Sequence, residues 1–166
     1  MSDSRVVVLV GPMGVGKTTL GKKLATALDL PFFDTDALVV RSHGEIKTIF
    51  ENLGEEVFRK FEEDAVLHAI SSPAVVATGG GAILSQLTRQ RLHHCTVVYL
   101  ETDGKHVKSR LKGGKRPLVQ NGFEDWIRIY EDRKAIYEEV ADITIDTSNQ
   151  TLSATLTELK EKLEPK

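Results

Sequence analysis

Short apolar runs alternate with longer amphipathic segments along most of the chain. The apolar runs are rich in β-branched residues and predict strands at 5–10, 31–33, 74–77, 96–100 and 142–146. All but the second run are apolar throughout or nearly so, as expected for parallel strands that are buried on both faces. The intervening segments predict helices at 17–28, 37–42, 46–52, 55–70, 85–93, 104–111, 124–139 and 151–163.

This order of elements predicts the fold class. Strands that alternate with helices favour an α/β fold, here a parallel five-stranded sheet with helices on both faces in a three-layer α/β/α arrangement. The segment KGGKRPLVQNGFED at 112–125 interrupts the alternation, because it has three glycines, one proline and little periodicity. Loops of this length in a compact domain often act as functional lids, so we interpret about 112–124 as a mobile lid.

The composition narrows the class of protein without indicating a reaction. The 166 residues suit one compact domain over 1–166, and the net charge of −2 gives no basic excess that would attract nucleic acid or a membrane surface. No apolar run approaches transmembrane length, and the N-terminus lacks the layout of a signal peptide. The single cysteine, Cys95, excludes an internal disulfide. We therefore expect a cytoplasmic protein, monomeric at this size, with no nucleic-acid or membrane partner.

The strongest chemical signal is GPMGVGKT, from Gly11 to Thr18, which fits the pattern G-x-x-x-x-G-K-[ST]. It follows a predicted buried strand and opens a predicted helix, which is the context that this phosphate-binding loop requires. Its glycines let successive backbone N–H groups point at phosphate oxygens. Lys17 reaches the β- and γ-phosphates, and the Thr18 hydroxyl ligates Mg²⁺. The expected ATP-binding residues in this stretch are Gly11, Met13, Gly14, Val15, Gly16, Lys17, Thr18 and Thr19.

The kind of P-loop protein can be narrowed further. The GTPase patterns D-x-x-G and N-K-x-D do not occur in the sequence, and a motor or large ATPase would be much longer. A glycine-rich turn with an incidental lysine is the alternative, but the strand, motif and helix all agree on a P-loop. A small-molecule kinase therefore fits the chain best.

Further polar groups follow the predicted strands. Asp34 and Asp36 come after the second strand, and Gly79–Gly81 come after the third. Since ligands of open parallel sheets bind outside the carboxyl ends of the strands, these groups should surround one crevice with the P-loop. Three arginines lie farther along: Arg59 in FRKFEE, Arg116 in KRPL and Arg133 in YEDRKAIYEEVAD.

Each of these charged residues also has a simpler interpretation. Arg59, with Glu62 and Glu63 following on the same helix, could form a surface ion pair worth a few tenths of a kcal/mol. The same holds for Arg133 among its acidic neighbours, and Arg116 could be an exposed lid charge. The two aspartates could be a metal site, an acid/base pair, or a polar connection in which Asp36 caps the following helix.

Taken together, the motifs resemble the shikimate kinase family. The resemblance rests on GPMGVGKT, DTD, FRKFEE, TGGGA, KRPL and R-x-x-x-Y-x-x-V-A-D, which occur in family order and with similar spacing over nearly the whole chain. It implies a P-loop kinase fold with substrate-binding helices at about 35–62. It also implies Mg²⁺-dependent transfer of the γ-phosphoryl group of ATP to the 3-hydroxyl of shikimate, in the biosynthesis of aromatic amino acids through chorismate.

The resemblance also implies roles for individual residues. Asp34 would bind the metal with Thr18, and Asp36 would accept the proton of the attacking hydroxyl or position it. Arg116 would reach the transferring phosphate, and Arg110 matches a position near the adenine. The expected catalytic residues are Lys17, Asp36 and Arg116. The expected shikimate-binding residues are Asp36, Arg59, Gly79, Gly80, Gly81 and Arg133, of which the two arginines match the family's carboxylate binders.

The sequence departs from the family in one loop and leaves two other functions open. Family members often carry arginine or proline against the adenine after the last strand, where this chain has DTSNQT at 146–151. The first alternative is another small-metabolite kinase, such as a gluconate kinase, and the arginine pair with TGGGA argues against it. The second is a non-catalytic nucleotide-binding module, and the complete set of charged motif residues argues against that.

Overall fold

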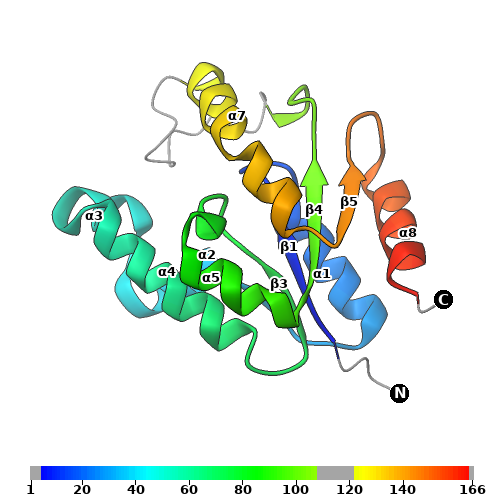
Figure 1. Cartoon of the computed structure of the whole chain (residues 1–166), viewed down its shortest axis with the longest axis horizontal. Helices are drawn as coiled ribbons and strands as arrows, with labels where there is room; N and C mark the ends of the chain where they lie inside the picture. The colour runs from blue at the N-terminus through cyan, green and yellow to red at the C-terminus, as the bar shows by residue number, and fades with distance from the viewer. Residues whose placement is uncertain (1–4, 108–121, 165–166) are drawn as a thin grey trace.

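The computed structural model of the chain describes residues 5–107 and 122–164 (Figure 1). They contain a five-stranded, parallel sheet with the strand order β2-β3-β1-β4-β5. The strands are β1 (Val6–Val10), β2 (Phe32–Asp34), β3 (Ala74–Ala77), β4 (Thr96–Glu101) and β5 (Ile143–Asp146). All five predicted strands are confirmed, and each boundary differs from the prediction by no more than one residue.

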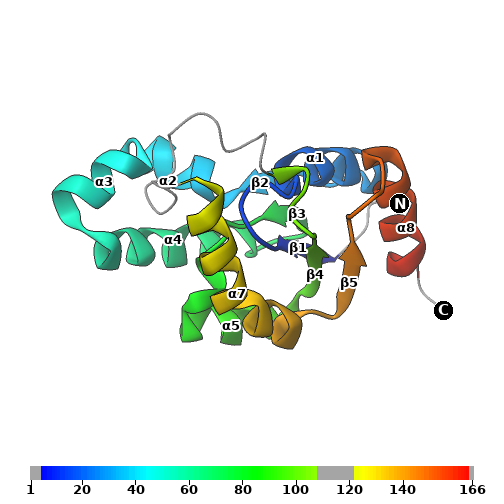
Figure 2. The same ribbon diagram turned by 90° about the horizontal axis from the view of Figure 1, so that it is seen from above.

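Helices cover both faces of this sheet. They are α1 (Lys17–Leu28), α2 (Thr35–His43), α3 (Ile46–Leu53), α4 (Glu55–Ala69), α5 (Gln86–Arg91), α7 (Phe123–Val140) and α8 (Leu152–Leu163), with short 3₁₀ turns η1 (Ala82–Leu84) and η2 (Leu92–His94). Figure 2 shows α1 and α8 on one face of the sheet and α4, α5 and α7 on the other. The predicted three-layer α/β/α class is therefore confirmed.

The central strand explains why the layers form. Val7 and Leu9 of β1 pack with α1 and α8, whereas Val8 and Val10 pack on the opposite face with α4 and α7. Side chains of a strand alternate between its two faces, so an unbroken apolar run buries apolar surface on both. The two hydrophobic cores that result enclose the sheet.

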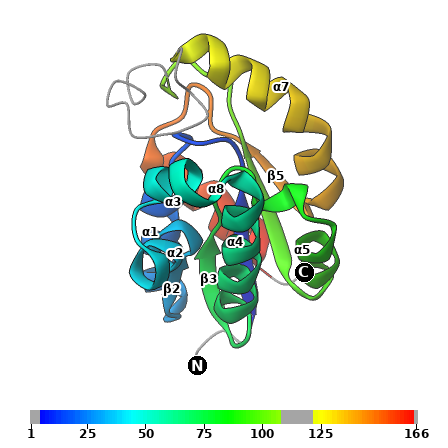
Figure 3. The ribbon, with the colours of Figure 1, turned by 90° about the vertical axis from the view of Figure 1, so that its left-hand side faces the viewer.

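A third apolar cluster lies outside the sheet. Val39 of α2, Ile49 of α3 and Phe58 of α4 are buried against one another, and Figure 3 shows these helices side by side at the β2 edge. The predicted substrate-binding segment at about 35–62 is therefore a helical subassembly with its own small core. Helices α2 and α3 contact mainly α4, and α2 also contacts β2 at the edge of the sheet.

Some predicted boundaries were wrong. The helix predicted at 37–42 begins at Thr35, because Asp34 and not Asp36 is its N-cap. The helix predicted at 85–93 is an α-helix followed by a 3₁₀ turn. Helix α7 begins at Phe123, so the last two residues of the predicted lid segment lie in that helix. Residues 112–121 of the lid and residues 108–111 of the helix predicted at 104–111 lie outside the described residues. Within the described part of the chain, no helix has both the length and the apolar character needed to span a membrane.

The packing of α1 on the sheet gives a stability prediction. Leu24 is 0 % exposed in the core that joins α1 to β1, whereas Leu53 at the end of α3 is 56 % exposed. We expect Leu24→Ala to lower the free energy of unfolding by about 2–5 kcal/mol, through lost apolar contact and a residual cavity. Leu53→Ala is the matched control and should change it by less than about 0.5 kcal/mol. Urea denaturation measures both, and equal losses would contradict this description of the core.

Candidate active site

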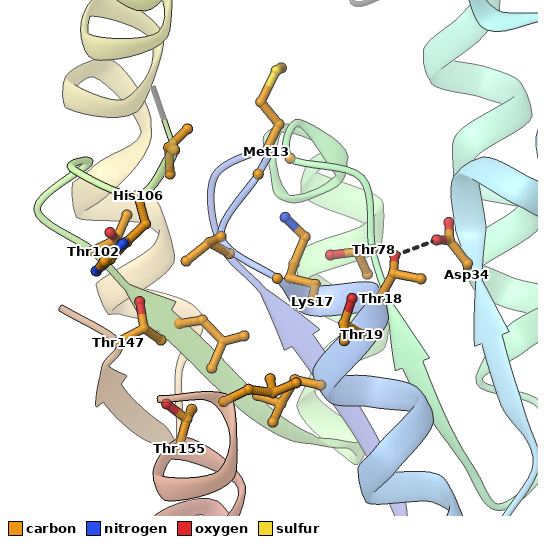
Figure 4. A pocket seen from close by; sticks show the side chains of 18 of the residues that line it. Met13, Lys17, Thr18, Thr19, Asp34, Thr78, Thr102, His106, Thr147 and Thr155 are labelled. Atoms are coloured by element: carbon orange, nitrogen blue, oxygen red, sulfur yellow. Dashed lines mark hydrogen bonds between the residues drawn. The ribbon is translucent and has the colours of Figure 1, made fainter. Parts of the chain in front are cut away.

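A cavity of about 550 Å³ lies over the carboxyl ends of the strands. The P-loop after β1, the ends of β2 and β3, and the segments that follow β4 and β5 line it. In Figure 4, Lys17 and Thr18 lie at its centre, with Asp34 on one side and Thr102 and Thr147 on the other. The parallel sheet thus brings together groups that are far apart in the sequence, as expected for a crevice at this edge.

The P-loop takes a conformation that depends on glycine at two positions. Gly11 has a φ of 148°, and a Cβ atom added there would lie 2.7 Å from the carbonyl oxygen of Leu100. Gly16 has a φ of 105° and is the N-cap of α1, where no side chain caps the helix. The first N–H groups of α1 therefore present the positive end of the helix dipole to the cavity, which suits an anion.

Lys17 is folded back against this loop. Its ammonium donates to the carbonyl oxygens of Gly11, at 2.7 Å, and Pro12, at 2.9 Å, and the residue is only 8 % exposed. A buried ammonium is costly unless hydrogen bonds compensate its charge, and here the loop carbonyls do so. The positive charge is therefore held within the loop that also carries the phosphate-directed N–H groups.

Asp34 connects the P-loop to α2. Its Oδ2 atom accepts a hydrogen bond of 2.7 Å from the Thr18 hydroxyl (Figure 4), and its Oδ1 atom accepts one of 3.2 Å from the backbone N–H of Ala37. The alternative in which Asp36 caps the helix is therefore wrong. The chain is still extended at Asp34, so this residue occupies the N-cap position and Asp36 falls in the first helical turn.

Two acidic side chains of the predicted acceptor site lie against the triple glycine. A Cβ atom on Gly79 would lie 2.6 Å from Oδ1 of Asp36 and 2.8 Å from Oε2 of Glu62. Its backbone N–H donates to the Thr35 hydroxyl at 3.1 Å, which fixes the loop against α2. A larger residue at Gly79 would therefore displace one of the two carboxylates.

The same loop also adjoins both arginines. A Cβ atom on Gly81 would lie 2.5 Å from the Nη atoms of Arg59, and one on Gly80 would lie 3.6 Å from Nη1 of Arg133. Arg133 is 7 % exposed, so the alternative of a solvated surface ion pair does not describe it. All described members of the predicted acceptor set are thus within reach of a single loop.

Arg59 does form the ion pair that the simpler interpretation predicted, although with a different second partner. Its Nη1 atom lies 2.8 Å from Oε1 of the buried Glu62, and its Nη2 atom lies 3.2 Å from Oε2 of Glu55. Glu63, the other predicted partner, accepts a hydrogen bond from Ser85 instead. The two carboxylates hold the guanidinium against Gly81, so ion pairing and a ligand-facing position are compatible.

Two predicted residues cannot be placed. Arg110 and Arg116 lie outside the described residues, so their assignments stay predictions. The loop at 146–151 can be placed, and it contributes Thr147 and Gln150 to the cavity lining. The Gln150 side-chain amide donates to the Asp146 carbonyl and, at 3.0 Å, to Glu158. Polar side chains therefore line this part of the cavity wall.

Comparisons with known proteins decide the family. A family model for shikimate kinase matches residues 13–164. A shikimate kinase from Vibrio cholerae is 39 % identical over 171 residues, covering 99 % of this chain and 98 % of the relative. The chain belongs to the shikimate kinase family. The solved shikimate kinase from Acinetobacter baumannii in complex with shikimate has a TM-score of 0.90 and 36 % identity, covering 98 % of this chain and 97 % of that one.

A more distant likeness bears on the gluconate kinase alternative. A gluconokinase from Sinorhizobium meliloti aligns with 98 % of this chain and 97 % of its own, with a TM-score of 0.63 and 22 % identity. That identity is low enough that the likeness extends to the fold alone. This likeness therefore gives no support for a gluconate kinase activity.

A kinase family of this type implies ATP with a divalent metal ion, and the site can be tested for a fit. Among the described residues, no group of three or more His, Cys, Asp and Glu side chains could hold a metal unaided. Mg²⁺ in kinases is bound by one or two protein groups, the substrate phosphates and water. The Thr18 hydroxyl and the Asp34 carboxylate, 2.7 Å apart at the P-loop, fit such a partial ligand set.

Sequence reasoning missed two aromatic residues of this shikimate kinase family member. The Trp126 indole donates to the carbonyl oxygen of Met13 at 2.8 Å, and the Tyr137 hydroxyl donates to the carbonyl oxygen of Gly80. Neither Trp126 nor Tyr137 was predicted as a site residue. No local signal marks either contact, because the partners are 113 and 57 residues apart in the chain.

Glu62 is the acidic group most perturbed by the site. Burial raises its pKa from about 4.5 to about 6, the ion pair with Arg59 opposes this, and the nearby Asp36 carboxylate adds to it. The folded protein thus holds this proton more tightly than the unfolded chain. The stability that protonated Glu62 contributes is fully present below about pH 4.5 and is lost as the pH rises through about 6.

The stability difference between wild type and Glu62→Gln should therefore depend on pH, because the glutamine side chain is neutral and does not ionise. The free energy of unfolding of the variant, relative to wild type, should rise between about pH 4.5 and 6 by on the order of 2 kcal/mol. Urea denaturation at a series of pH values measures this difference. Glu56→Gln, at an exposed position on the same helix, is the matched control and should follow the wild-type curve. A constant difference for Glu62→Gln would show that the site does not perturb this carboxyl.

Proposed function

We propose that this protein is a shikimate kinase. It transfers the γ-phosphoryl group of ATP to the 3-hydroxyl of shikimate, in the presence of Mg²⁺, and releases shikimate 3-phosphate and ADP. The reaction is a step in the biosynthesis of aromatic amino acids through chorismate. One observation carries the proposal: the P-loop, Asp36 and the glycine loop line the same cavity, and Arg59 and Arg133 flank that glycine loop.

The nucleotide side of the site binds and orients the phosphates. Lys17 exchanges loop carbonyls for phosphate oxygens, and the backbone N–H groups of the P-loop and of the start of α1 surround them. Thr18 and Asp34 would hold the Mg²⁺ ion beside these phosphates. When bound, the ion supplies neutralisation of charge on the phosphate oxygens.

The acceptor side binds the organic substrate through its carboxylate and its hydroxyls. Arg59 and Arg133 present planar guanidinium groups, which bind a carboxylate in two-point fashion. Glycine at 79 and 81 lets the carboxylates of Asp36 and Glu62 and the guanidinium of Arg59 approach the loop backbone closely. This combination of paired arginines and one carboxylate suits a small hydroxy acid, and shikimate has that chemistry.

Asp36 acts on the attacking hydroxyl. Its carboxylate accepts the hydroxyl hydrogen bond and aims the oxygen at the γ-phosphorus. As the new P–O bond forms, the bond from that phosphorus to the bridging oxygen breaks and ADP leaves with the electron pair. The hydroxyl proton passes to Asp36. Arg116 stabilises the transferring group, and Arg110 packs near the adenine.

We also infer the setting of this activity. Residues 1–166 act as one domain, with about 112–124 closing over the cavity to exclude water as a competing acceptor. The protein works as a monomer in the cytoplasm, on ATP and shikimate alone. The one-domain assignment is supported by the continuous five-stranded sheet and by the position of the cavity at one edge of that sheet.

A coupled assay of ADP release tests the function. We expect ADP release that depends on shikimate, and Lys17→Ala should lower turnover by about 100-fold or more because phosphate stabilisation is lost. A panel with gluconate separates the alternatives. Turnover of gluconate without shikimate would favour the other kinase class, and ATP binding without any acceptor-dependent ADP release would favour a non-catalytic module.

The two aspartates should respond differently to matched substitutions. Asp34→Asn keeps a good N-cap residue for α2, and we expect it to raise the Mg²⁺ concentration for half-maximal activity about tenfold or more. Asp36→Asn should instead lower kcat by about 100-fold or more and raise the KM for shikimate. Steady-state kinetics at varied Mg²⁺ and shikimate measure both effects. Indistinguishable profiles would contradict the division of roles.

A further inference from the structure

Helix α7 reaches both substrate loops through aromatic side chains. Near its start, the indole N–H of Trp126 donates to the carbonyl oxygen of Met13 in the P-loop at 2.8 Å. Three helical turns later, the hydroxyl of Tyr137 donates to the carbonyl oxygen of Gly80 in the triple-glycine loop. One rigid element thus holds a backbone carbonyl on the nucleotide side and another on the acceptor side.

Trp126 is itself held firmly. It is 3 % exposed, and its ring stacks on Phe123 with centroids 5.4 Å apart. A Cβ atom on Gly104 would lie 2.8 Å from Cζ3 of Trp126, so the backbone at Gly104 packs directly on the indole. Because its ring cannot shift freely, Trp126 directs its N–H at one fixed point on the P-loop.

The hydrogen bond from Trp126 to the Met13 carbonyl also affects the direction of the Gly14 N–H. The C=O of Met13 and the N–H of Gly14 belong to one planar peptide unit and point in opposite directions. The indole on one side therefore fixes the direction of the Gly14 N–H on the other, where Gly14 lines the cavity. Phosphate binding by a P-loop depends on the directions of such N–H groups.

Tyr137 has the corresponding place on the acceptor side. Its hydroxyl donates to the Gly80 carbonyl, and a Cβ atom on Gly80 would lie 3.6 Å from Nη1 of Arg133. Burial raises the pKa of Tyr137 to about 12, and Arg133 opposes this, so the hydroxyl remains a donor at physiological pH. The ring stacks on Tyr99 with centroids 5.2 Å apart. Tyr137 therefore holds the middle of the glycine loop at the point where that loop adjoins Arg133.

We propose that Trp126 and Tyr137 are positioning residues that act on different substrates, Trp126 on the nucleotide and Tyr137 on the acceptor. Each residue acts through the group it holds: Trp126 through the Met13–Gly14 peptide, and Tyr137 through Gly80, which adjoins Arg133. The acceptor half rests on the proposed function, since it takes shikimate as the ligand of Gly80 and Arg133. The nucleotide half needs only the P-loop.

Crossed binding measurements on the full chain test this division. Tyr137→Phe removes one oxygen and keeps the ring. Trp126 is the only tryptophan in the chain, so replacing tryptophan globally by benzothienylalanine changes position 126 alone and exchanges the N–H for sulfur in a ring of similar shape. Trp126→Phe is a second variant that also lacks the donor. Calorimetry with a non-hydrolysable ATP analogue plus Mg²⁺, and separately with shikimate, gives the dissociation constants.

The expected result is a double dissociation. Loss of one hydrogen bond should weaken the ATP analogue about three- to tenfold in the Trp126 variants, with shikimate changed less than twofold. Tyr137→Phe should weaken shikimate by a similar factor and leave the ATP analogue nearly unchanged. Each variant is the control for the other, since general loosening of α7 would weaken both ligands in both variants.

Other outcomes overturn the proposal in separable ways. If each variant weakens both ligands alike, or neither ligand is affected, α7 supports the fold only, and the proposed function stands as long as the wild type turns over shikimate. If the wild type does not bind shikimate, the proposed function and the Tyr137 half fall together. In that case the ATP analogue still decides the Trp126 half.

Discussion

The structure depends on one constraint, the burial of β1 between β3 and β4 in a fully parallel sheet. Val7 to Val10 are 0 % exposed, so neighbouring strands must satisfy their backbone groups and helices must cover both faces. Where β1 ends, the ladder stops, and the chain turns through a glycine-rich loop into α1. The parallel direction places the ends of all strands at this same edge, so the polar groups that leave the sheet converge there.

This convergence brings charged side chains into a buried region, where other groups of the site compensate their charge. Lys17, Glu62 and Arg133 are all nearly buried, and a buried charge is costly without partners. Carbonyl oxygens of the P-loop compensate Lys17, and Arg59 compensates Glu62. The ion pair consequently fixes Arg59 and Glu62 in direction before any ligand arrives, whereas Lys17 must exchange the loop carbonyls for phosphate oxygens. The elevated pKa of Glu62 shows that the compensation is incomplete.

The sequence allowed prediction of those features that local pattern encodes. Buried strands are continuous β-branched runs, so their boundaries were within one residue, and the P-loop carries its own spacing. Asp36 was one possible N-cap of α2, and the structure has Asp34 there instead. Both residues have the same capping chemistry, and only the end of β2 decides between them. The contacts of Trp126 and Tyr137 could not be predicted, since they join residues that the fold alone brings together.

Asp34 shows how the two sides of the site are linked through one carboxylate. One oxygen accepts from Thr18 in the P-loop, and the other accepts from Ala37 at the start of α2, the helix that carries Asp36. Two hydrogen bonds to separate oxygens fix the plane of the carboxylate as well as its position. A ligand that binds the Thr18 hydroxyl therefore changes a contact of the Asp34 carboxylate, which also caps the start of α2. The short turn after β2 is thus a direct structural connection between the nucleotide loop and the acceptor helix, independent of α7.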